Sequence, residues 1–265
     1  PFQNWTLCII IDTGIFMPFC FDATDYYGNV RFNKNHTITK DLNIYGDIEC
    51  YKPLTISSGV KLTVNGKVYT SEDIIINGAM EVTGDYVQEY SAELQLKNGH
   101  LLIGGNARFN YIYTKGITMS SDYDCIEIKG DLYIYSSSTL AINGGAIMVG
   151  GNVTVNAKAN VSESNTLIFN GDGLQTIKLN DNTTWGTIEL RNYSEEGVYS
   201  EKSFNKVKLV RNGCRLVYGD VYGEFGWKLN KDQVWEGDLV LIEDTLDLNG
   251  YKLTVTGNLI QKGGD

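Results

Sequence analysis

The residues best suited to acid–base chemistry in this 265-residue sequence are two carboxylate pairs, Asp122 with Asp124 and Glu195 with Glu196. Glycosidases place two carboxylates around the bond they cleave, and general acid–base catalysis needs such groups within reach of one substrate. Both pairs lie in Ser- or Tyr-flanked segments, where solvated charge is the usual interpretation. Nucleophile elbows, phosphate loops and H-E-x-x-H motifs are absent from the sequence. We predict no enzyme and assign no catalytic residue; a carbohydrate-active β-helix hydrolase or lyase is the alternative.

Metal chemistry also finds little support. Calcium-binding solenoid nonapeptides place an Asp after a double glycine, but Ala107-Arg108 follows Gly104-Gly105-Asn106, and Val153-Thr154 follows Gly150-Gly151-Asn152. Zinc needs closely spaced Cys or His ligands, and the two histidines and five cysteines show no such spacing. We predict no metal and no cofactor. The cysteines are interpreted as free small hydrophobes, with a Cys8–Cys20 disulfide as the alternative; they are Cys8, Cys20, Cys50, Cys125 and Cys214.

Aromatic residues are the candidates for binding. Tyrosines two positions apart project from one face of a strand, and two such pairs occur. Tryptophans fall in or near a less regular segment of the chain. Aromatic faces stack on sugar rings or dock a protein, although Tyr is also a good strand former whose ring can simply pack. The candidate binding residues are Tyr111, Tyr113, Tyr133, Tyr135, Trp185, Trp227 and Trp235.

The charge of the chain excludes two classes of partner. A net charge of −10 and a pI near 4.7 argue against nucleic acid and against an anionic membrane surface. The most apolar stretch, Leu7 to Phe21, contains Asp12 and is shorter than the roughly 20 residues of a membrane span. We therefore predict no membrane insertion and interpret this stretch as a buried strand pair or cap.

A short repeat indicates the elements that must position these side chains. Apolar residues alternate over three positions and are followed by Gly or Asn, which is typical of short strands joined by tight turns. Ile147 lies 21 residues after Ile126, and Val153 lies 21 after Leu132. We predict an all-β fold, a right-handed parallel β-helix (solenoid) with three short strands per coil of about 21 residues. A β-sandwich or barrel is the alternative.

The same pattern predicts which side chains share one core. They are Ile126, Ile128, Leu132, Ile134, Leu140, Ile142, Ile147, Val149, Val153 and Val155.

A longer repeat overlies the short one. Residues 32–44 match residues 229–241 at an offset of 197, and Lys61-Leu-Thr-Val-Asn-Gly66 matches Lys252-Leu-Thr-Val-Thr-Gly257 at an offset of 191. Strand spacing widens after residue 165, which predicts longer loops there. We divide the chain into a cap or leader (1–25), a regular solenoid (26–165), a solenoid with longer loops (166–237) and the start of the next repeat (238–265).

Three segments carry a resemblance to a known kind of module: Leu167–Ile177, Ile188–Val198 and Asp247–Gly264. With their Phe-Asn-Gly-x-Gly-x-Gln-Thr and Leu-Thr-Val-x-Gly steps, they resemble the tandem repeats of very large secreted or surface-anchored, adhesin-like β-solenoid proteins of Clostridia-like Firmicutes. The resemblance implies an extracellular or cell-surface bacterial repeat protein with no established enzymatic residues. Its expected partners are adjacent repeat modules of the same protein and a host or environmental glycan or protein.

The two ends of the solenoid are expected to differ. The edge of a terminal coil is unpaired unless it is covered. We expect residues 7–21 to fold over the first coil, with Ile9, Ile11, Ile15 and Phe19 as the buried face. We expect the strand around Leu253 to present an open edge onto which a following module would stack.

Overall fold

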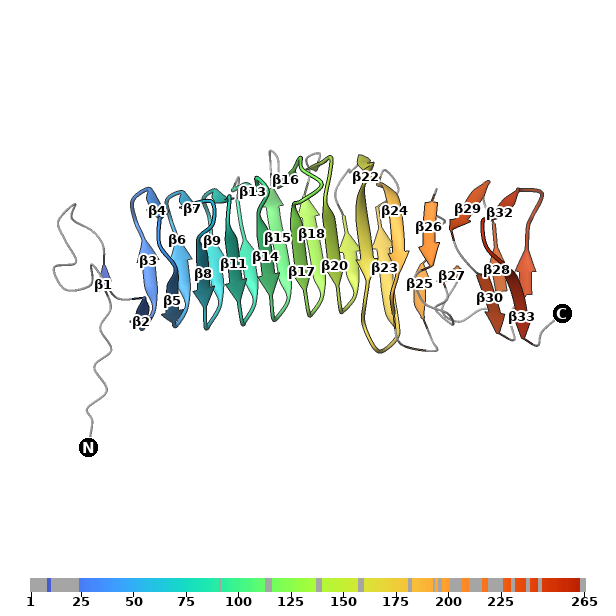
Figure 1. Cartoon of the computed structure of the whole chain (residues 1–265), viewed down its shortest axis with the longest axis horizontal. Helices are drawn as coiled ribbons and strands as arrows, with labels where there is room; N and C mark the ends of the chain where they lie inside the picture. Colours follow the sequence, from blue (N-terminus) through green and yellow to red (C-terminus); the bar gives the residue numbers. More distant parts are fainter. Residues whose placement is uncertain are drawn as a thin grey trace, which may run out of the picture.

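The computed structural model describes residues 24–200 apart from gaps at 91, 113–115, 137–139, 157–159, 181–182, 193 and 195–196. It also describes residues 9–10, 206–209, 216–218, 226–229, 232–236, 239–242 and 245–262. The described residues contain strands and turns but no helix, and so no helix that could cross a membrane. Their strands stack side by side along one axis (Figure 1).

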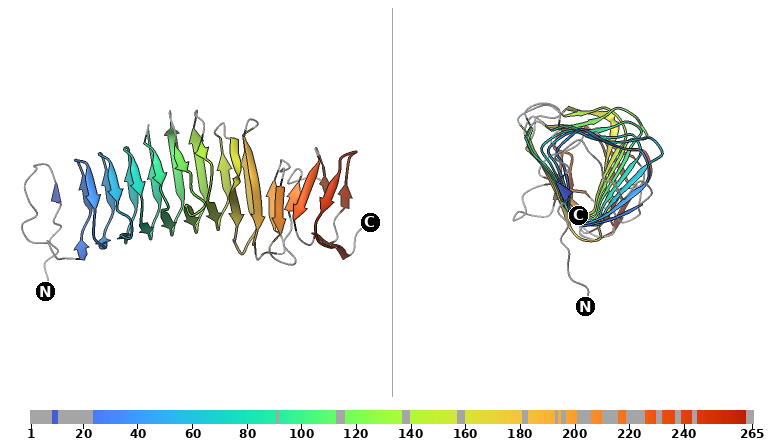
Figure 2. Two further views of the ribbon diagram at one scale, coloured as in Figure 1. Left: turned by 45° about the horizontal axis from the view of Figure 1, so that its top comes forward. Right: turned by 90° about the vertical axis from the view of Figure 1, so that its left-hand side faces the viewer.

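The chain winds repeatedly through three parallel sheets, and looking along the axis the coils follow one rounded outline (Figure 2). Sheet A contains β1 (Ile9–Ile10), β3 (Val30–Phe32), β6 (Ile48–Cys50), β9 (Val68–Thr70), β12 (Tyr86–Gln88), β15 (Ala107–Ile112), β18 (Leu132–Ser136), β21 (Val153–Val155), β23 (Gln175–Leu179), β25 (Val198–Ser200) and β27 (Leu216–Tyr218).

Sheet B precedes sheet A in each coil. It contains β2 (Asp25–Tyr27), β5 (Leu42–Tyr45), β8 (Lys61–Val64), β11 (Ala79–Val82), β14 (His100–Ile103), β17 (Cys125–Ile128), β20 (Ala146–Val149), β22 (Asn160–Phe169), β24 (Thr184–Leu190), β26 (Lys206–Leu209), β29 (Gln233–Glu236) and β32 (Leu253–Val255).

Sheet C completes the coil. It contains β4 (His36–Ile38), β7 (Leu54–Ile56), β10 (Ile74–Ile76), β13 (Leu94–Leu96), β16 (Ile117–Met119) and β19 (Ala141–Ile142). Towards the other end, β28 (Gly226–Lys228) pairs with β31 (Thr245–Asp247), and β30 (Leu239–Ile242) pairs with β33 (Leu259–Lys262). These three-sheet coils confirm the predicted parallel β-solenoid.

The register of the strands confirms the predicted step, because Ile126 pairs with Ile147 and Leu132 pairs with Val153. Every strand pair in the described residues is parallel, so the sandwich alternative is wrong. The coil length nevertheless varies along the chain. The step from Val30 to its partner Ile48 is shorter than the predicted one, and the step from Ala107 to its partner Leu132 is longer.

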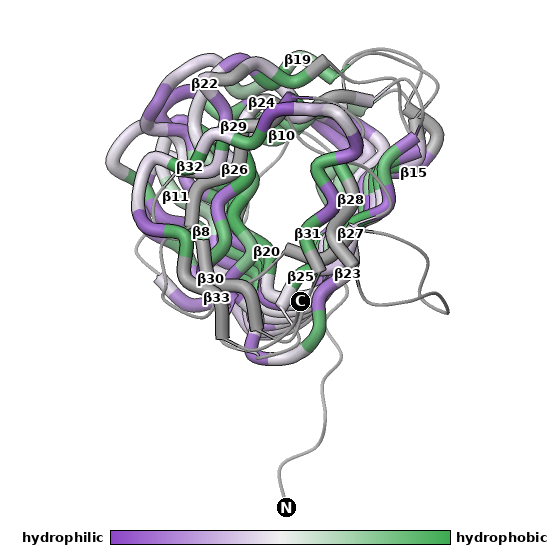
Figure 3. The backbone as a smooth tube through the Cα atoms, turned by 90° about the vertical axis from the view of Figure 1, so that its right-hand side faces the viewer, coloured by the Kyte–Doolittle hydropathy of each residue, from purple (hydrophilic) through white to green (hydrophobic). Residues whose placement is uncertain are grey.

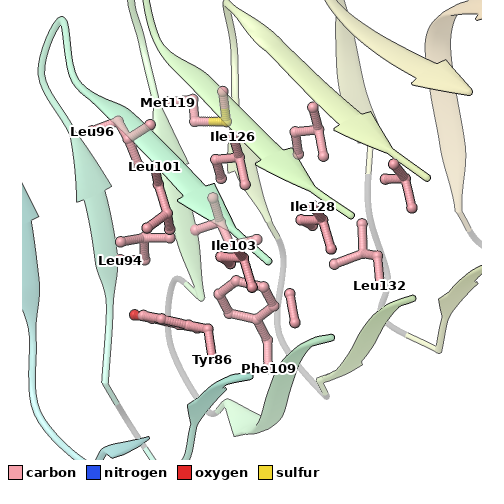
Figure 4. Packing of buried hydrophobic residues seen from close by; sticks show 14 of the residues in the cluster. Tyr86, Leu94, Leu96, Leu101, Ile103, Phe109, Met119, Ile126, Ile128 and Leu132 are labelled. Carbon is pink, nitrogen blue, oxygen red and sulfur yellow. The ribbon is translucent and has the colours of Figure 1, made fainter. Parts of the chain in front are cut away.

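The predicted core residues all point inward. The ten side chains are at most 3% exposed, and they belong to one continuous apolar cluster. Along the strands, buried residues alternate with more exposed ones, so hydrophobic and hydrophilic positions alternate in Figure 3. Neighbouring coils interlock through these side chains, as Ile126 and Ile128 do with Leu101 and Ile103 (Figure 4). Full burial of each such side chain stabilises the fold by roughly 1.5–3 kcal/mol.

The corner between sheets B and A is built from a repeated Gly-Asx dipeptide. The amide of Asp131 donates to Asn106 Oδ1 at 2.8 Å, and the amide of Asn152 donates to Asp131 Oδ1 at 2.6 Å. The amide of Gly130 donates to the carbonyl of Gly105 at 3.0 Å. A Cβ atom at Gly130 would lie 2.6 Å from Asn106 Oδ1, and its φ is outside the left-handed region. Glycine is therefore needed here for space, and not for the positive φ that turn chemistry suggests.

The long repeat has one structural offset. Residues 42–45 and 233–236 both form strands of sheet B, which corresponds to an offset of 191. The offset of 197 would instead match β5 with β30, which lies outside sheet B. At the other end, Ile9 pairs with Val30, so a strand of the expected cap segment joins sheet A. The side chains of Ile9, Ile11, Ile15 and Phe19 lie outside the described residues.

Candidate functional site

The outer face of sheet A carries two clusters of tyrosine, arginine and carboxylate side chains. Strand pairing aligns one outward residue from each coil along this face, between inward residues that are buried. The row consists of Arg31, Glu49, Tyr69, Val87, Arg108, Tyr133 and Thr154. A second row beside it contains Tyr51, just after β6, and Tyr135, which pairs with Asn110. The coil therefore assembles residues that are distant in sequence.

The first cluster centres on Tyr133 and Tyr135. Their rings are nearly parallel, with centroids 6.1 Å apart, which confirms that the two side chains share a face. Tyr133 Oη donates to Asp131 Oδ2 at 2.8 Å, and the Arg108 guanidinium lies 5.4 Å from the Tyr133 ring centroid. The hydrogen bond to Asp131, assisted by burial, raises the pKa of Tyr133. The phenol therefore remains a protonated donor whose ring is held in place, while Tyr135 is 40% exposed.

The other candidate tyrosines are less well defined. Tyr111 lies in β15, but its side chain is outside the described residues, as is all of Tyr113.

A second cluster lies on the same face. The Tyr51 and Tyr69 centroids are 6.4 Å apart, and the Arg31 guanidinium lies 5.3 Å from the Tyr51 ring centroid. Arg31 also pairs with Glu49 at 2.6 Å. Tyr69 Oη donates to Glu89 Oε2 at 2.9 Å; burial first, and then Glu89, raise the pKa of Tyr69 to about 12.

Sequence reasoning missed this second cluster. The signal was the spacing of Tyr51 and Tyr69, which is close to one coil of this part of the solenoid. This spacing can be recognised as a contact between neighbouring coils only when the local coil length is known.

A further tyrosine pair lies at the corner that leads from sheet B into sheet A. Tyr27 and Tyr45 are paired in register, with centroids 4.7 Å apart and an interplanar angle of 9°. Both rings are exposed.

Two of the candidate tryptophans are core residues. Trp185 is 2% exposed, and its Nε1 donates to the buried Asn165 Oδ1 at 3.1 Å. Trp235 is fully buried. Both rings pack in the apolar core and neither is displayed on the surface, so the expectation of display is wrong for both. The Trp227 side chain lies outside the described residues, although its backbone is part of β28.

The carboxylate pairs do not form a described acid–base site. Asp124 is 1% exposed and accepts hydrogen bonds from the backbone amides of Gly99, Ser120 and Ser121. It is therefore an internal turn acceptor, and not the solvated charge expected from its flanking residues. Asp122 is exposed, whereas Glu195 and Glu196 lie outside the described residues.

The described residues offer no group of three or more His, Cys, Asp and Glu side chains that could hold a metal ion. Cys50 and Cys125 are free thiols. Burial raises the pKa of Cys50 to about 12, so this thiol stays protonated and inert. Cys8, Cys20 and Cys214, and with them the Cys8–Cys20 alternative, lie outside the described residues.

Comparison of the chain with protein-family models, with curated proteins and with solved structures gives no match. The fold and the geometry of the aromatic face are thus the basis for a functional proposal.

Proposed function

We propose that the chain is a structural and adhesive repeat module of a large extracellular surface protein, and that the outer face of sheet A binds a polysaccharide. The observation that carries the binding proposal is the presence of two tyrosine clusters on the outer face of one sheet. Tyr69 and Tyr133 are separated by the coils of Val87 and Arg108, which amounts to three coil steps. At about 4.8 Å per step the two rings are about 14 Å apart along the axis. An extended glycan chain can contact both clusters at once.

The chemistry of the face suits sugar rings. Aromatic faces stack on the apolar side of a pyranose, while charged and amide side chains bind its hydroxyl groups. Hydrogen bonds to Asp131 and Glu89 fix the two phenols beforehand, which lowers the conformational entropy lost on binding. Because the chain carries a net charge of −10, it repels polyanions, and the glycan we propose is uncharged.

The test is a glycan array followed by titration calorimetry with an uncharged polysaccharide that the array identifies. We expect the double variant Tyr133→Ala/Tyr135→Ala to weaken binding at least roughly tenfold, which corresponds to about 1.4 kcal/mol. Tyr123→Ala is the matched control, because Tyr123 is 81% exposed on a turn outside the tyrosine rows. Its affinity should be that of the unaltered chain.

Two results would contradict the proposal. In the first, the unaltered chain binds no uncharged glycan. In the second, Tyr123→Ala weakens binding as much as the double variant, which would mean that tyrosine content alone matters.

A further inference from the structure

Two coils at opposite ends of the solenoid are built alike and are related by the shorter offset of the long repeat. In the earlier coil, Leu42 of β5 pairs with Leu62 of β8, and Ile48 of β6 pairs with Val68 of β9. In the later coil, β29 and β32 align Gln233 with Leu253, and β30 and β33 align Leu239 with Leu259. The step between partners is the same in all four pairs. The two coils therefore share one strand register.

Their turns also repeat the same hydrogen bonds. The Lys61 amide donates to Asp41 Oδ1 at 2.8 Å, and the Lys252 amide donates to Asp232 Oδ1 at 2.9 Å. The Asn65 amide donates to the Ile44 carbonyl at 2.7 Å, and the Thr256 amide donates to the Trp235 carbonyl at 3.0 Å. The same backbone contacts at the same offset show that the similarity in sequence is a similarity in structure.

The two coils differ in what covers them. β11 and β12 lie on β8 and β9, and Leu62, Val64 and Val68 are fully buried. In the later coil, Leu253 and Val255 are only partly buried, and Leu259 is 56% exposed. Among the described strands, β32 ends sheet B, and β33 has β30 as its one partner.

The covered coil shows which groups face the next one. The Val64 carbonyl accepts from the Thr83 amide at 2.9 Å, and the Val68 amide donates to the Asp85 carbonyl at 2.9 Å. By the shared register, the Val255 carbonyl and the Leu259 amide hold these positions on the edge of β32 and β33. Such a strand edge is a template for another strand in parallel register.

We infer that the edge of β32 and β33 is a docking surface for a further solenoid coil with the residue pattern of positions 72–90. The same contact between coils is repeated along the whole molecule, so docking would continue an established interface. Inward side chains at the positions of Met80, Val82 and Tyr86 would cover Leu253, Val255 and Leu259, as their counterparts cover the earlier coil. This inference rests on the proposed role as a stacking module and is independent of the glycan-binding face.

The test extends the chain in the register that the structure defines. Because Lys262 corresponds to Ser71, a copy of residues 72–200 is joined directly after Lys262. Hydrogen exchange is then measured at the amides of Leu253, Val255 and Leu259. We expect exchange at these amides to slow by about a hundredfold or more relative to the unextended chain, because a paired edge opens far less often.

Two variants of the extension separate docking from a general effect of added sequence. Changing the Met80 and Tyr86 positions of the added copy to Asp should abolish the protection, because these side chains face the interface. Changing its outward Glu81 and Val87 positions to Lys should leave the protection intact. In the unextended chain, Leu259→Lys should leave exchange in the earlier coils unchanged, whereas in the extended chain it should reduce protection of the edge.

Equal exchange at the edge in the extended and unextended chains would overturn the inference. Sedimentation showing that the unextended chain dimerises with protection of β33 would also overturn it, and would assign the edge to a second copy. Glycan binding measured on the same samples makes the outcomes distinguishable: loss of edge protection with binding retained refutes only the docking surface.

Discussion

At the corner between sheets B and A, the coils up to residue 156 and the coils that follow hold neighbouring turns together by different means. At the regular corner, most coils contribute a Gly-Asx step whose short side chain accepts one amide from the next coil, as Asn106 does from Asp131. At the corresponding corner after residue 156, one long buried amide, that of Gln175, does this. Gln175 alone donates to the carbonyls of Val149 and Gly151 and accepts from the Gly171 amide. The first arrangement spreads its contacts over many coils, whereas the second concentrates them in one side chain.

The concentration of contacts at Gln175 predicts the largest effect. Gln175 is 1% exposed, and its Oε1 also accepts from Asn192 Nδ2 at 2.7 Å. Gln175→Leu keeps the volume but removes the partner of the Gly171 amide and of the Gly151 carbonyl, at about 1–3 kcal/mol each, whereas the Val149 carbonyl still accepts from the Asn170 amide. We expect the free energy of unfolding, measured by urea denaturation, to fall by about 3 kcal/mol or more. Gln95→Leu is the control, since Gln95 is partly exposed and bonds to Glu93 on the outer face; a loss as large there would contradict the comparison.

Gln175 also belongs to one of the sequence steps singled out in the sequence analysis. It is the Gln of the Phe-Asn-Gly-x-Gly-x-Gln-Thr step, and in the structure that residue is a buried connection between coils. This sequence motif therefore contains the side chain that links its coil to the preceding one.

A change in the regular corner should have an intermediate effect. The Gly130→Ala substitution brings a Cβ to 2.6 Å from Asn106 Oδ1 and 2.8 Å from the Gly105 carbonyl oxygen. Backbone on both coils must move, and overpacking of this kind costs about 1–3 kcal/mol. Gly173→Ala is the matched control, because no described atom lies within 4 Å of the added Cβ. Thermal unfolding should show a lower midpoint for Gly130→Ala and almost none of that decrease for Gly173→Ala. Equal midpoints would mean that the corner is looser than its contacts indicate.

The sequence sufficed for the fold because the alternation of apolar residues is dictated by strand geometry. The pairing of Ile126 with Ile147 follows directly from that alternation. The positions of Trp185 and Asp124 did not follow, because a ring or a carboxylate can be buried when a partner such as Asn165 or the Ser121 amide satisfies it. Asn165 comes from the neighbouring coil, so its alignment with Trp185 depends on the local coil length, whereas the Ser121 amide meets Asp124 through the conformation of their shared turn.

The aromatic face was predictable only in part for the same reason. Tyr133 and Tyr135 are two residues apart, so one strand brings them together. Tyr51 and Tyr69 come from neighbouring coils and meet diagonally, because Tyr69 pairs with Glu49, two residues before Tyr51.

The smallest effect is expected for a single side chain of the Gly-Asx corner. Asp131 Oδ1 accepts from the Asn152 amide and Oδ2 accepts from Tyr133 Oη. Asp131→Asn retains an oxygen at the first position, so the contact between coils survives and only one acceptor, near the surface, is lost. A net contribution of about 0.5–1.5 kcal/mol is typical of one hydrogen bond, and we expect a loss at the low end of that range in urea denaturation. Asp131→Ala removes both acceptors, and its loss should approach the upper end of the range.

The other hydrogen bonds of the corner between sheets B and A limit the destabilisation expected for Asp131→Asn. Neighbouring coils keep their own Asx contacts, such as the Asn106 amide to Asp85 Oδ1 at 2.8 Å, and they hold the strands in register when one contact is removed. If Asp131→Asn instead destabilised the protein as much as Gln175→Leu, the contacts at this corner would be as concentrated before residue 156 as they are after it, and the contrast between the two regions would not hold.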